Sequence, residues 1–223
     1  MQLPASSSSY RSRVRYGRYL SRRLRRAKFS QMADDTAAVT NALREAGRAW
    51  DDADDAIQDA LADRDGADDD LDRIAQEARV TLAGRAVDAV KTSPYTDVFP
   101  AGISYFTAAP LDEEVKRYTE LRGRLTEHLP AADEVRKKAG KGIDAGLKEF
   151  EAAMKAVDAA RTAEALAATR LAKATDVWEK QMEKAFGALV AEVGRAAADQ
   201  FFPRVGRKTA VEPKGAKGDK KPA

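Results

Sequence analysis

The sequence predicts an all-α protein, an elongated antiparallel helical bundle or coiled coil of four to five helices with flexible basic termini. Apolar residues recur in steps of three and four in several separate stripes between Phe29 and Pro203, which keeps them on one face of each helix. No segment shows the alternation of apolar and polar residues that is typical of a half-buried strand. The long stripes share no repeat of about 20–50 residues, which disfavours a solenoid.

Charge is distributed unevenly along the 223 residues, and this distribution predicts three regions, although the charge segments and the predicted domains differ slightly in their bounds. Residues 1–33 hold nine basic and no acidic residues, and residues 1–27 are predicted to form a basic, Ser- and Arg-rich arm whose first nine residues are disordered. Residues 34–205 carry 24 basic and 34 acidic residues, and residues 28–204 are predicted to form the helical bundle domain. Residues 205–223 form a Lys-, Gly- and Pro-rich tail, which we expect to be disordered.

The first long helix is predicted over residues 28–64. Its apolar stripe runs from Phe29 to Leu61, and its outer face is rich in Asp. Asp65-Gly66 is a turn signal, so we expect a break there. A second helix then follows, with a stripe that ends at Val90.

The stretch 93–110 has a different character, because it holds four aromatic residues between prolines. A connection of this length is unusual in a compact domain, where most are about 4–6 residues long. We expect Phe99, Tyr105 and Phe106 to be buried as an apolar plug that closes one end of the bundle. The alternative is a partner-binding surface on which these rings are exposed together.

Two further helical regions follow this aromatic stretch. Pro110 suits the first position of a helix that Pro130 ends. The stretch 131–202 contains no Pro, and we expect a turn near Arg161-Thr162, with Thr162 as a helix cap, because no large apolar residue occurs there. Trp50 and Trp178 both lie on apolar stripes and are interpreted as core anchors.

The composition excludes most common active sites. The chain has no Cys, so it has no disulfide, thiolate nucleophile or Cys-ligated metal. Its one His, His128, is interpreted as a helix-end residue and cannot supply a di-iron site. The Asp-rich segment 51–72 lacks the ligand spacing of a calcium loop and is interpreted as a solvated helix face. We therefore predict a protein that is not an enzyme and uses no cofactor, metal or small-molecule substrate.

The strongest functional signal is the basic segment 10–29. Arginine suits phosphate because its planar guanidinium donates two hydrogen bonds at once, and Tyr10, Tyr16 and Tyr19 could stack on bases. These features predict a helical scaffold or interaction protein whose basic tails bind a polyanion, foremost nucleic acid, and removal of residues 1–33 should abolish the binding. The predicted polyanion-binding residues are Arg11, Arg13, Arg15, Arg18, Arg22, Arg23, Arg25, Arg26, Lys28, Lys217, Lys220 and Lys221.

Several alternatives to polyanion binding stay open. The basic arm could pair with the Asp-rich helix of the same chain. It could also pair with the acidic body of another chain, which predicts a homo-oligomer and a self-assembling structural or surface-coating protein. An Ala-rich helical body with a basic tail resembles phasins in composition, although no ordered motif supports that family. Residues 1–33 also have the composition of an organelle-targeting segment or of a membrane-surface segment. Without an apolar span or secretory signal, we expect a cytoplasmic protein.

Overall fold

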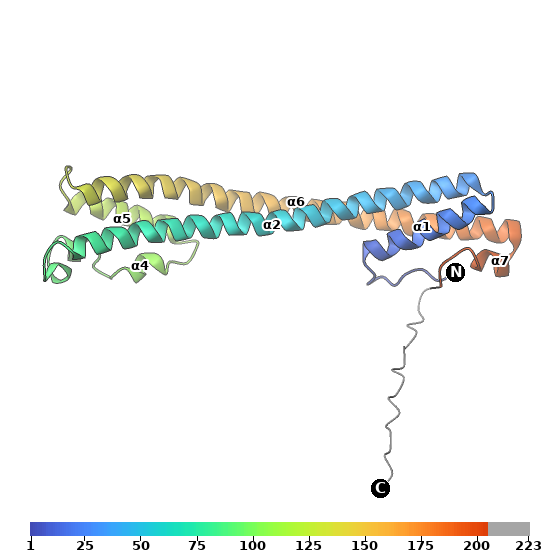
Figure 1. Ribbon diagram of the computed structural model, residues 1–223, viewed down its shortest axis with the longest axis horizontal. Helices are drawn as coiled ribbons and strands as arrows, with labels where there is room; N and C mark the ends of the chain where they lie inside the picture. Colours follow the sequence, from blue (N-terminus) through green and yellow to red (C-terminus); the bar gives the residue numbers. More distant parts are fainter. Residues whose placement is uncertain (205–223) are drawn as a thin grey trace, which may run out of the picture. The chain divides into compact units, whose positions relative to one another are not determined.

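The computed structural model describes residues 1–204, and every regular element in this range is a helix (Figure 1). The all-α prediction is therefore confirmed for these residues, and long packed helices form the fold. The elements are α1 (Tyr10–Arg26), α2 (Ser30–Ala83), the 3-10 helix η1 (Ala89–Lys91), α3 (Tyr95–Val98), α4 (Ser104–Thr107), α5 (Glu114–His128), α6 (Glu134–Val193) and α7 (Arg195–Asp199). Within residues 1–204, no helix is both long enough and apolar enough to cross a membrane.

The described residues group into two compact units, whereas the sequence analysis treats 28–204 as one bundle. Unit 1 holds residues 1–48 together with the described residues from Arg170 onward. In unit 1, α1 packs against α2 and α6 around a core that contains Leu20, Leu43, Trp178 and Met182, all fully buried. The ring of Tyr16 meets Trp178 edge-on, with 5.8 Å between the ring centroids.

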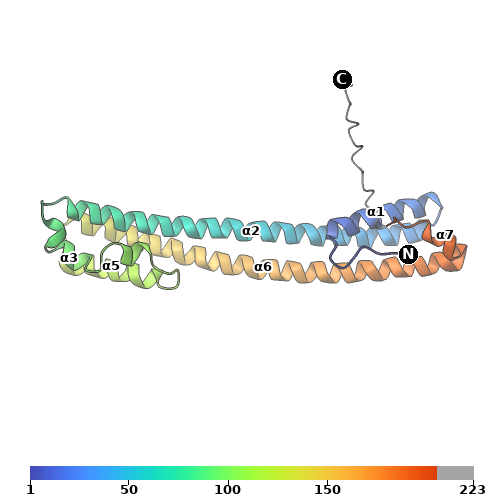
Figure 2. The same cartoon turned by 90° about the horizontal axis from the view of Figure 1, so that it is seen from below.

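Unit 2 holds residues 49–169. Here α5 lies beside α2 and α6, and the short helices α3 and α4 pack close to α5 (Figure 2). The shared core includes Leu71, Tyr118, Leu125, Ile143 and Phe150, none of which is more than 1% exposed.

The predicted break at Asp65-Gly66 is wrong, because α2 is continuous from Ser30 to Ala83. The apolar stripe stays in register across this site, with Ala60 and Leu71 both buried. A glycine inside a helix costs about 1 kcal/mol relative to alanine, which is less than the packing that a break would disrupt.

The predicted turn near Arg161-Thr162 is also wrong. Helix α6 runs without interruption from Glu134 to Val193. The hydroxyl of Thr162 donates a hydrogen bond to the carbonyl oxygen of Asp158 at 2.9 Å, one turn earlier in the same helix. Thr162 is thus an interior helix residue and caps nothing.

The N-terminal arm also needs correction. Residues 10–26, predicted as part of a flexible arm, form α1 and contribute Val14, Tyr16, Leu20 and Leu24 to the core of unit 1. Its thin apolar face is sufficient because two long helices supply the remaining sides of the core. The predicted tail 205–223 lies outside the described residues.

The aromatic stretch is buried as expected at two of its three key positions. Phe99 is 3% exposed and Phe106 is 1% exposed, and their rings meet edge-on at 5.9 Å between centroids. Tyr105 is half-buried instead, and its hydroxyl donates a hydrogen bond to Glu120.

The two tryptophans, both predicted as core anchors, differ in burial. Trp178 is fully buried, whereas Trp50 is half-buried and donates from Nε1 to Glu164 Oε1 at 2.6 Å.

Candidate polyanion-binding surface

Helix α1 has well-defined ends, because both termini are capped. At the start, Ser9 Oγ accepts a hydrogen bond from the N–H of Ser12 at 3.3 Å. At the end, Lys28 adopts a left-handed conformation with φ 67°, and the N–H of Phe29 donates to the carbonyl oxygen of Leu24 at 3.0 Å. This pattern is a Schellman motif, which satisfies the last carbonyl groups of the helix.

One face of α1 is held close to its neighbours in unit 1. Gly17 lies where a Cβ atom would come within 2.8 Å of Trp178 Nε1 and would also collide with the hydroxyl of Thr40. The hydroxyl of Tyr16 donates to the carbonyl oxygen of Gln2 at 2.8 Å. Burial, and secondarily the charge of Asp199, raises the pKa of Tyr16 well above its ordinary value. This face serves packing, so binding must involve the opposite one.

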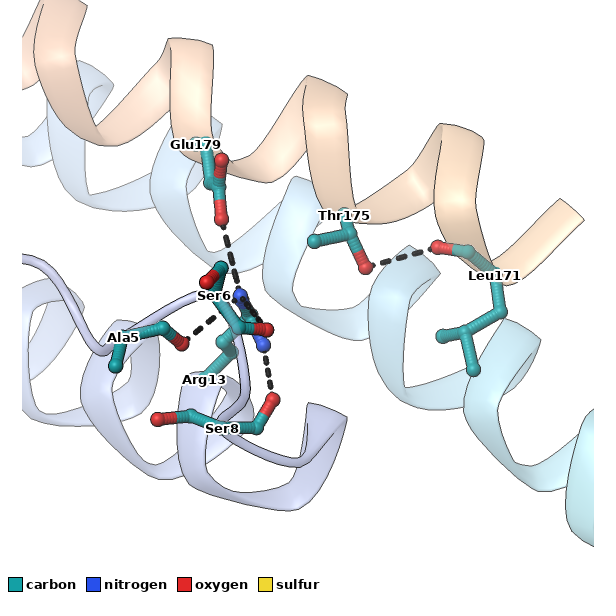
Figure 3. Close-up of polar contacts among 7 residues, drawn as sticks. All are labelled: Ala5, Ser6, Ser8, Arg13, Leu171, Thr175 and Glu179. Carbon is teal, nitrogen blue, oxygen red and sulfur yellow. Dashed lines mark hydrogen bonds and ion pairs between the residues drawn. The ribbon is translucent and has the colours of Figure 1, made fainter. Parts of the chain in front are cut away.

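Arg13, which the sequence predicts as a polyanion-binding residue, belongs to the packed face, so we leave it out of the candidate surface. Its guanidinium is largely buried and pairs with Glu179 Oε1 on α6 at 3.2 Å (Figure 3). It also donates to the carbonyl oxygens of Ala5, Ser6 and Ser8. These bonds tie the first residues of the chain to α6, and they occupy the donors that a phosphate would need.

The opposite face of α1 carries a row of exposed arginines, which we call the arginine stripe. Successive members are three or four residues apart, so they point to the same side of the helix. From first to last the row is about 22 Å long, at about 1.5 Å per residue. The arginine stripe consists of Arg11, Arg15, Arg18, Arg22 and Arg26, all of them exposed.

The other basic residues predicted in this segment differ in the contacts that they make. Arg23 donates to the carbonyl oxygen of Gln200 at 3.3 Å and lies over the ring of Phe201. Arg25 is paired with Asp34 of α2, and Lys28 is exposed at the end of α1. The predicted residues Lys217, Lys220 and Lys221 lie outside the described part of the chain.

The electrostatics of the arginine stripe are one-sided. Helix α1 contains no acidic residue, and within residues 1–204 no ion pair involves Arg15, Arg18, Arg22 or Arg26. Like charges one turn apart destabilise a helix by a few tenths of a kcal/mol per pair. An external anion would relieve this repulsion, so the stripe is suited to bind one.

Only one of the three candidate stacking tyrosines faces solvent. Tyr16 is 4% exposed, and Tyr10 is half-buried with its ring packed over Gly47. Tyr19 is 44% exposed and lies one turn from both Arg15 and Arg23. The tertiary packing of α1 therefore selects Tyr19, a choice that sequence spacing alone could not make.

The Asp-rich segment of α2 is largely solvated, in agreement with its interpretation from the sequence. Asp52, Asp55, Asp59 and Asp63 are exposed, and their spacing of three and four residues forms an acidic row. In residues 1–204, no group of three or more acidic or histidine side chains has a geometry that could hold a metal ion.

A cluster of buried polar groups in unit 2 was missed by sequence reasoning. Glu114 of α5 is 1% exposed, and its Oε1 has no hydrogen-bond partner among the described residues. Burial and the neighbouring Asp68 and Asp72 of α2 raise the pKa of Glu114 to about 8. Tyr118, one turn further along α5, is fully buried and donates to Asp72. The one signal in the sequence was the spacing of one helical turn between Glu114 and Tyr118 and between Asp68 and Asp72.

Comparisons of the chain with protein-family models, with curated proteins and with solved structures gave no match.

Proposed function

We propose that this protein is a non-catalytic helical scaffold that binds a polyanion, foremost nucleic acid, through the arginine stripe. The observation that carries the proposal is the segregation of α1 into two faces. Leu20 and Leu24 anchor one face in the core of unit 1, while five arginines and no acidic residue are presented on the other. The helix thus displays its charge on a fixed, folded support.

Counterion release supplies the binding energy in this proposal. Double-stranded DNA carries one negative charge per about 1.7 Å of axis with both strands counted, so about 22 Å of duplex carries more phosphates than the five arginines of the stripe can contact. Arginines that neutralise phosphates release condensed cations, and the affinity then falls steeply as salt rises. We expect binding that depends on salt and is indifferent to base sequence.

The test replaces three stripe residues together by point substitution and does not remove the segment. Deletion of residues 1–33 would remove Leu20 and Leu24 from the core, so a loss of binding would not distinguish contact from unfolding. The triple variant Arg15→Gln, Arg18→Gln and Arg22→Gln, here the stripe variant, keeps the packed face of α1. Fluorescence anisotropy with a labelled duplex of about 20 base pairs should show at least ten-fold weaker binding at low salt.

A matched control distinguishes the effect of removing stripe arginines from the effect of lowering the net charge. Lys148, Lys155 and Arg161 are exposed on α6, and changing all three to Gln alters the net charge by the same amount. This control variant should bind within about two-fold of wild type, because its substitutions are in unit 2, on a different helix from the stripe. Equal weakening in both variants, or no binding of either duplex or single-stranded DNA by wild type at low salt, would contradict the proposal.

Self-assembly is a second candidate function, favoured by one specific observation. The acidic row on α2 has the same three-and-four spacing as the arginine stripe, and both rows are exposed. The stripe of one copy could therefore dock on the acidic row of another, as in a structural or coating protein. Light scattering across salt concentrations tests this: the second candidate predicts oligomers at low salt that dissociate as salt rises, and a monomer throughout would rule it out.

A further inference from the structure

A hollow in unit 1 lies beside the arginine stripe and shares Tyr19 with it. The hollow has a volume of about 850 Å³, and its lining includes Tyr19, Gln2, Gln200, Phe202 and Arg204, together with Asp199, whose carboxylate is paired with the N-terminal ammonium of Met1. Sites for small organic ligands measure roughly 300–1,000 Å³, so its size is in the range for a nucleobase with its sugar.

The lining combines the groups that an unpaired base needs. Tyr19 is 44% exposed and supplies an aromatic ring for stacking, and Phe202, which is only 4% exposed, adds apolar atoms to the lining. The side-chain amides of Gln2 and Gln200 can each donate and accept hydrogen bonds, as the edge of a base requires. Arg204 is exposed and adds a positive charge.

The position of Tyr19 connects the hollow to the phosphate-binding row. Tyr19 follows Arg15 by four residues and precedes Arg22 by three, so the ring lies alongside the stripe. A strand whose phosphates contact the stripe could therefore turn a base towards Tyr19. Bases inside a duplex are already stacked and paired, and they cannot enter such a hollow without being extruded.

We propose that the polyanion bound by α1 is a single-stranded nucleic acid, with its phosphates on the arginine stripe and one base stacked on Tyr19 in the hollow. This inference rests on the proposed function, and it adds the class of nucleic acid and the residue that selects it. Stacking on one aromatic ring contributes enough to change the affinity by about ten-fold or more, and it tolerates any base.

The experiment uses full-length protein and three labelled or competing probes. They are an oligothymidine of about 12 nucleotides, an abasic strand of the same length, and heparin, which has charge but no bases. Wild type should bind the oligothymidine about ten-fold more tightly than the abasic strand. Tyr19→Ser should remove this difference and leave heparin binding unchanged, whereas Tyr19→Phe should keep it.

The outcomes separate this inference from the function on which it rests. If wild type binds heparin and both strands equally, or if Tyr19→Ser keeps the preference for bases, the single-strand assignment is overturned while polyanion binding stands. If wild type binds none of the three probes at low salt, the proposed function is overturned, and this inference falls with it.

Discussion

The hydroxyl of Tyr118 donates a hydrogen bond to Asp72 Oδ1 at 2.6 Å and so joins α5 to α2 in the core of unit 2. Tyr118→Phe removes this bond and leaves the carboxylate of Asp72 without the donor, which should lower the free energy of unfolding by about 1–2 kcal/mol. The same change should raise the pKa of Asp72, because the hydrogen bond from Tyr118 lowers it. Urea denaturation measures the first effect.

Tyr105→Phe is the matched control for this substitution. Tyr105 also donates to a carboxylate, Glu120 Oε2 at 2.8 Å, but its side chain is only half-buried. We expect a change in the free energy of unfolding within about 0.5 kcal/mol, as is usual for surface positions. Equal effects of the two substitutions would show that the buried bond contributes nothing beyond an exposed one.

The stability of unit 2 should decrease as pH rises through neutrality, because of Glu114. Its ordinary pKa is 4.5, and burial with the nearby Asp68 and Asp72 raises it to about 8 in the folded chain, against a smaller opposing effect of Arg117. Between these two values the folded state holds a proton that the unfolded state has released. The free energy of unfolding therefore falls from about pH 4.5 to about pH 8 and levels off above it.

Glu114→Gln should abolish most of this fall, because the amide has nearly the same shape and does not ionise. Urea denaturation at several pH values across this window measures the effect. Glu151→Gln, at an exposed position on α6, should retain the wild-type pH dependence. If the free energy of unfolding of Glu114→Gln falls with pH as steeply as that of wild type, Glu114 is excluded as the source of the pH dependence.

The close approach of α1 to α2 and α6 depends on Gly17. A Cβ atom at this position would collide with Thr40 Oγ1 and disturb the hydrogen bond that Trp178 Nε1 donates to it at 3.3 Å. Gly17→Ala should therefore lower the free energy of unfolding by about 1–3 kcal/mol, as overpacked cores do. At Gly187, also in unit 1, a Cβ atom would meet nothing within 4 Å, so Gly187→Ala should be stabilising. Thermal melts that shift in the same direction for both would be inconsistent with this packing.

Gly66 tests the continuity of α2. The residue is exposed inside the helix, and an added Cβ atom would have no neighbour within 4 Å. In a continuous helix Gly66→Ala should raise the free energy of unfolding by roughly 0.5–1 kcal/mol, because alanine has the higher helix propensity. If Gly66 lay in a turn, the substitution would leave the free energy of unfolding unchanged or lower it. Urea denaturation of this one variant therefore distinguishes a continuous helix from a turn.

The sequence could predict the long helices but not where they would continue, and it missed α1. The apolar stripes through Leu43, Leu71 and Trp178 identify α2 and α6 correctly. Local signals at Gly66 and Thr162 suggested ends, but each has an energy of about 1 kcal/mol or less, and packing along the stripe exceeds that.

The candidate site was predictable in its residue types and spacing, and not in its detail. The three-and-four spacing of the arginine stripe can be read from the sequence once α1 is known to be a helix. The sequence could not show that Arg13 is held in a structural ion pair, because its partner Glu179 is 166 residues away. The choice of Tyr19 over Tyr16 likewise depends on which face of α1 packs against the core.

The slope of binding against salt concentration tests the central claim most directly. For duplex DNA the logarithm of the affinity falls with the logarithm of the salt concentration by about 0.9 for each phosphate neutralised. The stripe variant lacks three of the proposed contacts, so its slope should be shallower than that of wild type by roughly 2.7. The Lys148, Lys155 and Arg161 control variant should keep the wild-type slope. Identical slopes for wild type and the stripe variant would contradict the assignment of the arginine stripe as the polyanion-binding surface.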